Sequence, residues 1–348
     1  MSEGAKTWLV TGGSGYFGSV LVRLLRERGE RVRVLDLSES DERPPEVELI
    51  QGDVRDPALV ARAVEGADVV LHNVAQVPLA KDRHQFWSVN QGGTETLLAA
   101  AKQAGVGKLV YTSSSAIYGA PARNPVDEET PPTPAEDYGR AKLEGERACR
   151  RYAEQGLDVS IVRPRTILGH GRLGIFQILF EWVRRGKNLP VLGRGDNRYQ
   201  FVHSDDLADA ILRAAERPGA RSYNVGAAEF GTMRETLEAL CRHAGTGSLV
   251  RSLPQRPVEL GARLATRLGL VPLGPYHALM YGRSLWFDLS RTSEELGWEP
   301  RWSNAEMIVQ SYEWYLANRE AVLSGAGASH HTRGIARLGL LKVLPWLL

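Results

Sequence analysis

The sequence has little cysteine and no long hydrophobic run. Its 348 residues include two cysteines, Cys149 and Cys241, which stand far apart and fit no CxxC or zinc-ligand spacing. This excludes a disulfide-stapled scaffold and predicts a reducing environment. No apolar run reaches the 18 or so residues of a membrane-spanning helix, and the polar start at residues 1–6 has no signal-peptide character. We therefore expect a cytoplasmic protein without a metal-binding motif.

An excess of charge of either sign is also absent. Lys and Arg together number 43 and Asp and Glu 41, which gives a formal net charge of +2. A balance this even offers no electrostatic reason to expect nucleic acid as a partner, so we expect a small molecule instead. Apolar residues make up 43% and charged residues 24%, an ordinary globular composition that excludes a disordered or fibrous chain. The length predicts one large domain or two coupled domains.

Short apolar runs alternate with helical patterns in the first half of the chain. A stripe at about 16–28 has helical spacing, and another helical pattern precedes residue 108. Strands separated by helices imply right-handed crossovers and a parallel sheet. The expected fold class is therefore α/β, a doubly wound Rossmann sheet with a smaller C-terminal substrate-binding region. The expected strands are 7–10, 31–36, 47–50, 68–72, 108–112 and 159–162.

A glycine-rich turn directly follows the first expected strand. Glycine lets such a turn tighten and lets backbone N–H groups approach a pyrophosphate at a helix N-terminus. Asp36 ends the second strand, where a carboxylate accepts hydrogen bonds from a ribose 2′-OH and repels a 2′-phosphate. The pattern predicts NAD rather than NADP, although Arg33 and Arg43 lie close enough in sequence to keep NADP open. The run TGGSGYFG places its glycines at Gly12, Gly15 and Gly18.

Two further signals suit acid–base chemistry. In YGRAK, Tyr138 and Lys142 are four residues apart and so lie on one helix face. A nearby ammonium group favours the phenolate and lowers a tyrosine pKa from its usual value near 10. The run YTSSS, from Tyr111 to Ser115, ends a parallel strand, and ligands bind at that edge of an open α/β sheet. A serine there could hold a substrate oxygen while Tyr138 moves its proton.

Other motifs extend the pattern along the chain. HNVA begins at His72, VNQGGT at Val89, FVHSDDLA at Phe201 and LGWEP at Leu296. Together with TGGSGYFG, TSSSAIYG, YGRAK and VRP, they resemble the motifs of the extended short-chain dehydrogenase/reductase family, the NAD-dependent epimerase/dehydratase group. The resemblance runs from about residue 7 to 318. It implies a Rossmann fold, bound NAD and a redox reaction by hydride transfer.

The resemblance also implies residue roles. Counting back from the end of TSSSAIYG puts the family's catalytic hydroxyl on Ser114, and Asn90 helps to organise the site. Tyr138 is then the acid–base, while Lys142 lowers its pKa and holds the nicotinamide ribose. The implied cofactor-binding residues are Gly12, Gly15, Tyr16, Phe17, Gly18, Asp36, Asp53, Val54, Val74, Ala75, Tyr138, Lys142, Pro164 and Thr166.

Departures from the family pattern narrow the reaction. Sugar-nucleotide 4,6-dehydratases carry Thr-Asp-Glu at the active-site strand, whereas this chain has Thr112-Ser113-Ser114, which speaks against dehydration. The Asn with which many epimerases contact a diphosphate after Arg163 is also missing, although Arg165 or Arg198 could meet a phosphate by another route. The YTSS run resembles the 3β-hydroxysteroid dehydrogenase-like branch.

The two regions expected to cover the substrate, about 170–195 and 250–285, are rich in large apolar residues. These residues suit a lipid-like substrate; the alternative is that most of them serve ordinary packing. We therefore expect an NAD-dependent oxidoreductase that interconverts a secondary alcohol and a ketone on a steroid, a 3-keto lipid or a ketosphingoid or ceramide type of substrate. The alternative is a nucleotide-sugar epimerase with the same triad and tightly bound NAD. A non-catalytic NAD-binding protein is a third reading, against which the intact triad argues.

The chain is expected to divide into three stretches. Residues 1–165 form the NAD-binding domain with the Ser/Tyr/Lys triad, 166–322 a substrate-binding region with segments that return to the Rossmann core, and 323–348 a linker and tail. Residues 329–348 contain no acid and interleave basic with apolar residues, which is typical of a basic amphipathic helix. Such a tail either makes peripheral contact with the cytoplasmic membrane face or packs on protein. The family resemblance further implies a homodimer.

Overall fold

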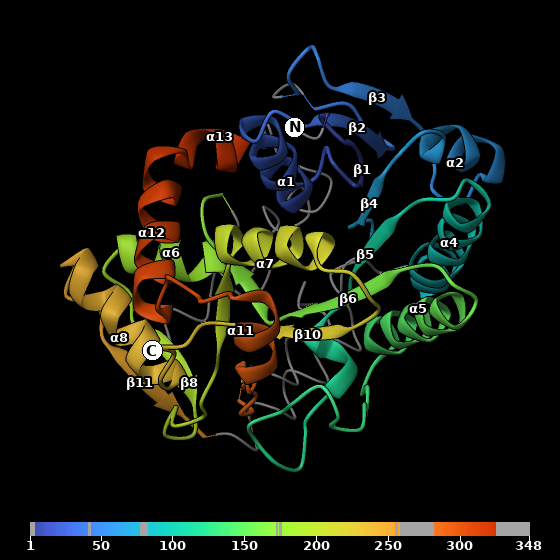
Figure 1. The fold of residues 1–348 in the computed structure, drawn as a ribbon. Helices are drawn as coiled ribbons and strands as arrows, with labels where there is room; N and C mark the ends of the chain where they lie inside the picture. The colour runs from blue at the N-terminus through green and yellow to red at the C-terminus, as the bar shows by residue number, and fades with distance from the viewer. Residues whose placement is uncertain are drawn as a thin grey trace.

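A computed structural model describes residues 4–40, 43–76, 83–171, 173, 176–254, 257 and 282–324 of the chain. Its larger part is a sheet flanked by helices, and a smaller group of helices and strands lies to one side of it (Figure 1). The tail at 329–348 and the expected cap residues from 258 to 281 lie outside the described residues. Among the described residues, no helix is long and apolar enough to cross a bilayer.

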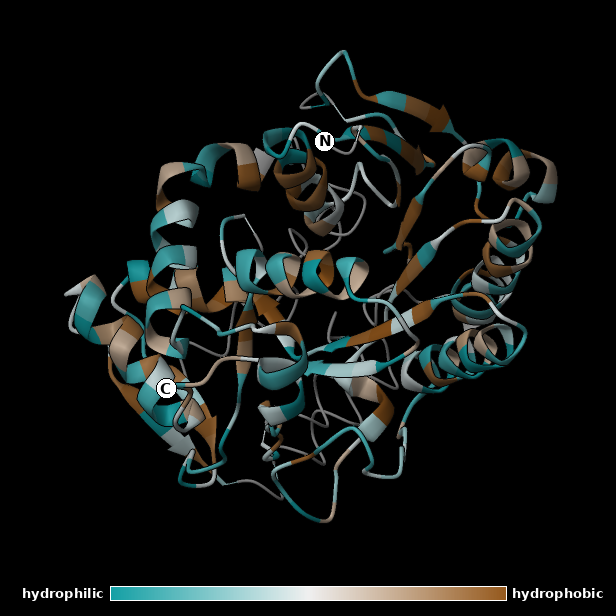
Figure 2. Ribbon diagram, in the orientation of Figure 1, coloured by the Kyte–Doolittle hydropathy of each residue, from teal (hydrophilic) through white to brown (hydrophobic). Residues whose placement is uncertain are grey.

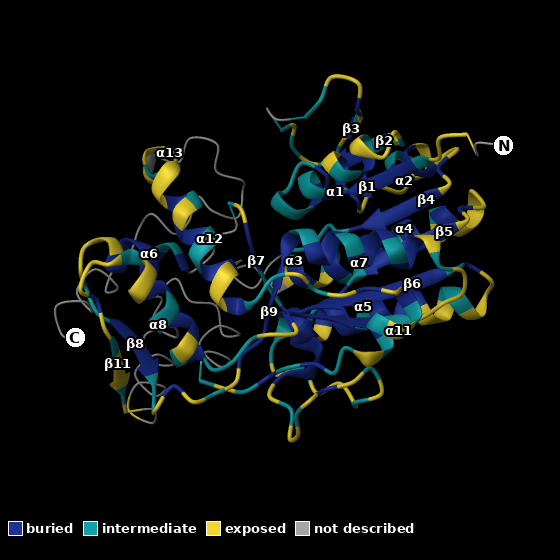
Figure 3. Cartoon of the chain, turned by 60° about the vertical axis from the view of Figure 1, so that its left-hand side comes forward, coloured by how far each residue is buried: buried dark blue, intermediate teal, exposed yellow. Residues whose placement is uncertain are grey.

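The sheet is parallel throughout and has the strand order β10-β6-β5-β4-β1-β2-β3. Every residue of β4 and β6 is buried, because helices cover both faces of the sheet (Figure 3). The chain runs from β1 outward to β3 and then returns to β4 on the other side of β1, so a crevice opens at the carboxyl ends of β1 and β4. The expected fold class is confirmed. The strands are β1 (Thr7–Thr11), β2 (Arg31–Asp36), β3 (Glu48–Gln51), β4 (Val69–His72), β5 (Lys108–Thr112), β6 (Val159–Pro164) and β10 (Ser222–Val225).

Two apolar layers hold the helices to this sheet. The helices α1 (Tyr16–Glu27), α7 (Ser204–Glu216) and α11 (Ser290–Leu296) bury Leu21, Ile211 and Leu296 in one layer. The other layer is contributed by α2 (Pro57–Val64), α4 (Thr94–Gln103) and α5 (Asp137–Glu154). Figure 2 shows the hydrophobic strands between them. The short helix α3 (Arg83–Trp87) and the π-helical turn η1 (Ser88–Gly93) lead into α4, and the 3₁₀ turn η2 (Ser115–Tyr118) follows β5.

Within the residues that the structure describes, the smaller region contains two short parallel pairs of strands and four helices. Strand β7 (Thr166–Leu168) pairs with β9 (Phe201–His203), and β8 (Leu189–Leu192) with β11 (Val250–Leu253). They share an apolar cluster with α6 (Phe176–Arg184), α8 (Met233–Ala244) and α12 (Asn304–Ala317), which continues into α13 (Arg319–Ser324). Strand β10 and helix α7 come from the same part of the chain and yet belong to the main sheet layers.

Candidate active site

The glycine-rich turn between β1 and α1 is packed too tightly for side chains. Gly12 has a φ of +73°, and a Cβ on Gly18 would lie 2.0 Å from the Gly12 carbonyl oxygen. A Cβ on Gly12 would also lie 3.2 Å from the backbone nitrogen of Val74, which follows β4. Because the turn carries no side chains at these glycines, a ligand in the crevice between β1 and β4 can approach its backbone closely. This is the cradle that a dinucleotide pyrophosphate requires.

Asp36 stands at the end of β2 beside this turn. Its Oδ2 accepts a hydrogen bond from the Ser14 amide at 3.1 Å, and its Oδ1 accepts one from the Ser38 amide at 3.2 Å. The carboxylate is thus fixed next to the glycines, where it can accept from the 2′-OH of an adenosine ribose. Arg33 is committed to Glu48 and to two carbonyl groups, and Arg43 to Glu39 and Val47. Neither arginine is held towards a 2′-phosphate, so the residues present fit NAD.

Removing the Asp36 carboxylate is expected to weaken NAD binding. In Asp36→Ala, the dissociation constant for NAD should rise about 10- to 100-fold, because charge-assisted hydrogen bonds are worth about 1.5–3 kcal/mol. NADP binding should change far less, so the preference between the two cofactors narrows. Fluorescence titration with both cofactors measures this, with Asp36→Asn separating charge from the contact to Ser14, and Glu27→Ala as an exposed acid control. Equal losses for NAD and NADP would contradict the assignment.

The adenine side of the expected site is formed by the loop after β3. The Asp53 carboxylate is held by Arg55, whose hydrogen bond lowers the pKa of Asp53. Val54 is buried, and a Cβ on Gly93 would meet it at 2.5 Å. Val74 and Ala75 are half-buried after β4. These positions stay predictions as adenine and pyrophosphate contacts.

Three consecutive serines follow β5, and their side chains make different contacts. Ser113 is buried and donates to Glu146 Oε1 at 2.7 Å. Ser115 is also buried, and its Oγ accepts from Arg165 at 2.9 Å. Ser114 is only half-buried, and its Oγ accepts from the Ala116 amide at 3.1 Å, which leaves its hydroxyl proton to donate. This pattern favours Ser114 as the hydroxyl that polarises a substrate carbonyl.

Helix α5 brings Tyr138 and Lys142 to the carboxyl end of β5. The N-terminus of the helix is capped, because the Glu136 side chain accepts hydrogen bonds from the amides of Tyr138 and Gly139. The Lys142 Nζ donates to the Thr112 carbonyl at 2.8 Å and lies 4.8 Å from the centre of the Tyr111 ring. Burial lowers the pKa of Lys142 to about 7, against the opposing effect of Glu146 and Cys149. The Lys142 amino group is therefore held in a fixed position at the carboxyl end of β5.

The Asn90 side chain is hydrogen-bonded to the loop that follows β4. Its Oδ1 accepts from the Gln76 amide at 2.7 Å and its Nδ2 donates to the Gln76 carbonyl at 3.0 Å. From the other side, Thr94 donates to the Asn90 carbonyl, and His72 links Thr94 to Thr11. Burial lowers the pKa of His72 to about 3, so this imidazole stays neutral. The arrangement gives Asn90 a positioning role, which remains a prediction.

The remaining expected contacts line the edge facing the smaller region. Thr166 shares a hydrogen bond with the Tyr199 hydroxyl at 2.8 Å, and Pro164 ends the fully buried β6. Phe17 packs against the layer of α1 and α7. Tyr16 lies close to Gly169, where a Cβ would stand 3.3 Å from its hydroxyl. These four positions stay predictions as nicotinamide-side contacts.

Sequence reasoning missed a buried ion pair close to the residues that are predicted to be catalytic. Glu146, one helical turn after Lys142, is fully buried and accepts from Arg163 at 2.8 Å through both carboxylate oxygens. Arg163 also donates to the Tyr118 hydroxyl at 2.7 Å. The pair joins α5, β6 and the end of β5. Glu146 could be seen in the sequence as an acid four residues after Lys142. Its partner Arg163 is distant in sequence, so the ion pair itself could not be predicted.

A family model describing the NAD dependent epimerase/dehydratase family matches residues 8–226 of this chain. The chain belongs to this family. It is accordingly an NAD-dependent enzyme of the extended short-chain dehydrogenase/reductase type.

Named relatives span several activities. The chain is 54% identical to "Uncharacterized protein y4nG" of Sinorhizobium fredii, over 99% of this chain and 86% of the relative. It is 31% identical to a UDP-glucose 4-epimerase of Mycolicibacterium smegmatis, over 88% of this chain and 97% of that one. It is also 31% identical to a 3 beta-hydroxysteroid dehydrogenase/Delta 5-->4-isomerase of Mycobacterium tuberculosis, over 92% of this chain and 93% of that one. Identity alone therefore does not separate a sugar-nucleotide from a lipid substrate.

Solved structures confirm the architecture. A UDP-glucose 4-epimerase from Thermotoga maritima with UDP-glucose superposes with a TM-score of 0.75 at 25% identity, covering 90% of this chain and 99% of that one. MoeE5 in complex with UDP-glucuronic acid and NAD has a TM-score of 0.72 at 24% identity, over 90% of this chain and 99% of that one, and shows the shared fold.

Proposed function

We propose that the chain interconverts a secondary alcohol and a ketone on a lipid-like substrate, such as a steroid, a 3-keto lipid or a ketosphingoid or ceramide type. Bound NAD supplies the two-electron redox chemistry. Tyr138 passes its phenolic proton to the carbonyl oxygen in reduction, and takes the alcohol proton in oxidation. Ser114 donates a hydrogen bond to that oxygen, and Lys142 stabilises the phenolate that Tyr138 becomes.

The observation that carries this proposal is the surroundings of Tyr138. The Tyr138 side chain belongs to the apolar cluster of the smaller region, together with Phe86 and Leu173, and not to the clusters of the Rossmann layers. The rings of Phe86 and Tyr138 meet edge to face with centroids 6.3 Å apart. A reacting carbon beside Tyr138 would therefore sit in an apolar environment, which a hydrocarbon skeleton suits better than a sugar.

The apolar residues that cover this region mostly pack on one another. Phe176, Phe180 and Trp182 are all buried in α6, and Phe180 contacts Tyr312 and Tyr315 of α12. Their side chains are therefore taken up by contacts within the apolar cluster. The packing interpretation thus applies to these members of the expected cap, and the lipid proposal depends on Tyr138 and its neighbours.

One observation favours the epimerase alternative. The exposed guanidinium of Arg198 lies over two neighbouring rings, Phe230 and Trp286, with its carbon 4.8 and 4.7 Å from ring centres that are 6.3 Å apart. No ion pair with a described residue involves Arg198. A cation held this way by two aromatic rings is suited to a phosphate of a nucleotide sugar.

Substrate panels with a cofactor readout separate the two candidates. We expect NADH to be consumed with steroid or long-chain ketones and NAD to be reduced with the matching alcohols. Arg198→Ala should leave these rates within about threefold, because an uncharged lipid offers no phosphate for this guanidinium to bind. Isomerisation of a UDP-sugar without net NADH formation, and its loss in Arg198→Ala, would overturn the lipid proposal and support the epimerase.

Membrane contact through residues 329–348 and homodimer formation also remain proposals. Membrane contact is compatible with a lipid-like substrate, since a basic amphipathic tail would bring the site to the membrane that holds such lipids. Sedimentation of the full chain with anionic vesicles tests the first, and its molecular mass in solution tests the second.

A further inference from the structure

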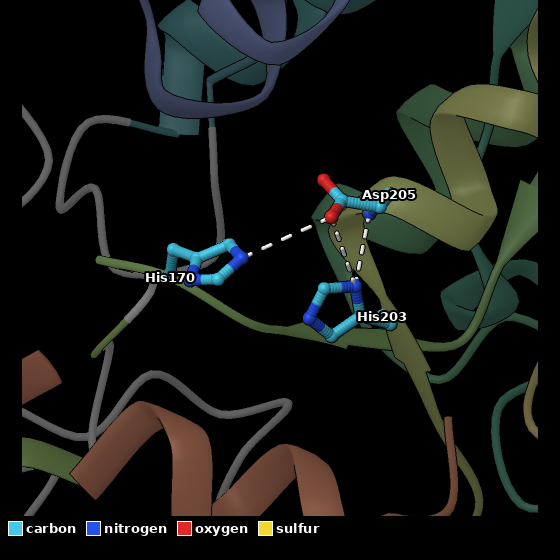
Figure 4. A group of neighbouring side chains, drawn as sticks. All are labelled: His170, His203 and Asp205. Carbon is cyan, nitrogen blue, oxygen red and sulfur yellow. Dashed lines mark hydrogen bonds and ion pairs between the residues drawn. The ribbon is translucent and has the colours of Figure 1, made fainter. Parts of the chain in front are cut away.

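Several buried titratable side chains have every polar atom hydrogen-bonded. Figure 4 shows one of them, His203, whose Nδ1 accepts a hydrogen bond from the Asp205 amide at 3.1 Å. The Nε2 of the same ring lies 2.7 Å from the Oε1 of Gln310, so both ring nitrogens are used. Lys108 is a second case, because its Nζ donates to the carboxylate of Asp158 and to two backbone carbonyl groups. Such partners offset the free-energy cost of burying a polar or charged group.

Lys142 differs from these side chains. It is only 2% exposed, yet its Nζ has a single hydrogen-bond acceptor among the described residues, the Thr112 carbonyl at 2.8 Å. No carboxylate in the described part of the chain forms an ion pair with Lys142. Glu146, one turn further along α5, is paired with Arg150 and Arg163. A buried ammonium group with one neutral acceptor is unfavourable, so its charge requires a further source of stabilisation.

The ring of Tyr111 lies against this ammonium group. The Lys142 Nζ is over the ring, 4.8 Å from its centre, which is well within the range of a cation–π interaction. The face of an aromatic ring carries partial negative charge and attracts a cation most strongly where water is excluded. Both side chains are buried, so solvent screens this attraction little.

The Tyr111 ring is confined by its neighbours. Tyr111 directly precedes Thr112 in β5, so the ring and the carbonyl that hold Lys142 come from consecutive residues. Gly145 lets α5 approach closely, because a Cβ at this position would lie 2.3 Å from the Tyr111 hydroxyl oxygen. On β4, the His72 ring lies against Tyr111 with ring centres 5.6 Å apart. The ring is therefore held between β4 and α5, next to the ammonium group.

The other titratable groups near Lys142 contribute little positive or negative charge of their own. Burial lowers the pKa of Lys142 to about 7, while Cys149 and Glu146 on the same helix oppose this shift. Burial, and then Lys142, lower the pKa of His72 to about 3, so this ring stays neutral. Burial raises the pKa of the Cys149 thiol well above its usual range, so the thiol stays protonated. The support that the Tyr111 ring gives therefore decides how much of Lys142 is charged near neutral pH.

We propose that Tyr111 is a positioning residue of the redox reaction, whose ring face keeps Lys142 in its ammonium form inside the protein. The role rests on the proposed function, in which the charge of Lys142 stabilises the phenolate of Tyr138. Tyr111 acts only through Lys142 and takes no part in proton transfer itself.

The charge of Lys142 can be measured without a substrate. Full-length protein carrying ¹³C at the Cε of its seven lysines is titrated by NMR, and Lys142→Met assigns the signal. Tyr111→Leu should move the Lys142 titration downward by about one pH unit or more, the shift that corresponds to a desolvated cation–π pair. Tyr111→Phe keeps the ring and should leave the titration within about 0.3 pH units. Lys108, at the other end of β5, should titrate unchanged in both variants and serves as an internal control.

A second substitution tests the charge distribution of the ring without changing its shape. Pentafluorophenylalanine at position 111 fills nearly the same space as phenylalanine, but the face of its ring carries partial positive charge. The Lys142 titration should fall at least as far as in Tyr111→Leu, and this variant keeps the test available if the leucine variant does not fold. Tyr223→Leu removes a buried tyrosine from β10 of the same sheet and should leave the Lys142 titration unchanged.

The Tyr138 phenol of the NAD-saturated protein reports the consequence for the reaction. Its titration should move upward in Tyr111→Leu but not in Tyr111→Phe, because less of Lys142 is charged. Equal Lys142 titrations in the phenylalanine, leucine and pentafluorophenylalanine variants would overturn the proposal. A shift in Tyr223→Leu as large as in Tyr111→Leu, or a Tyr138 titration that does not follow that of Lys142, would do the same. A wrong substrate class would leave all these titrations unchanged, so it is distinguishable from a failure of this inference.

Discussion

Replacing Tyr138 by phenylalanine is expected to lower kcat by about 10²- to 10⁴-fold, the usual contribution of a positioned acid–base. The ring stays in the apolar cluster with Phe86, so packing is preserved and only the proton-moving oxygen is lost. Steady-state rates with the substrate identified from the panel measure the effect, and NAD titration checks that the cofactor still binds.

A second tyrosine on the same helix serves as the matched control. Tyr152 lies towards the end of α5 and packs against the layer of α2 and α4. Tyr152→Phe should keep kcat within about twofold, because surface-side changes of this size have small effects. Should Tyr138→Phe retain the full rate, the acid–base assignment would be wrong.

Replacing Glu146 by alanine is expected to lower the free energy of unfolding by about 3–5 kcal/mol, the cost of leaving a buried charge without its partner. The Arg163 guanidinium loses both hydrogen bonds to the carboxylate, and the Ser113 hydroxyl loses its acceptor. Chemical denaturation of the variant and the wild type measures the difference.

Two companion variants separate the ion pair from the loss of a side chain. Glu144→Ala removes a partly exposed acid that pairs with Arg147 on the same helix, and it should change stability by about 0.5 kcal/mol or less. Combining Glu146→Leu with Arg163→Met should recover much of the loss, because apolar residues can replace a buried pair. A decrease below about 1 kcal/mol in Glu146→Ala would refute the structural role of the pair.

Local patterns were enough to predict the parallel sheet and six of its seven strands. The glycine turn, Asp36 and the Tyr138–Lys142 spacing can each be recognised from a few consecutive residues. Each depends only on local backbone conformation or on which residues share a helix face. Strand β10 was not predicted, since Ser222–Val225 has no apolar run. Its buried Asn224 is stabilised by Glu128 and Tyr118, which only the folded chain brings together.

Roles that depend on distant partners could not be predicted from sequence. Asn90 stood in a recognisable motif, but the loop contact that it makes through Gln76 depends on how the turn after β4 folds back. Glu146 meets Arg163 and Tyr111 meets Lys142 only through tertiary structure. The substrate is harder still, because side chains of several separate elements surround Tyr138.

The most direct test of the central claim is a titration of the Tyr138 phenol in the NAD-saturated protein, followed by NMR of ring-labelled tyrosine. We expect one phenol that titrates clearly below the ordinary tyrosine range near 10, a signal that disappears in Tyr138→Phe. In Lys142→Met that titration should move upward by about 1–3 pH units, because the nearby ammonium no longer favours the phenolate. The contrary result is a tyrosine spectrum with no titration below 10, or one that Lys142→Met leaves unchanged; either would show that Tyr138 and Lys142 do not form the acid–base pair.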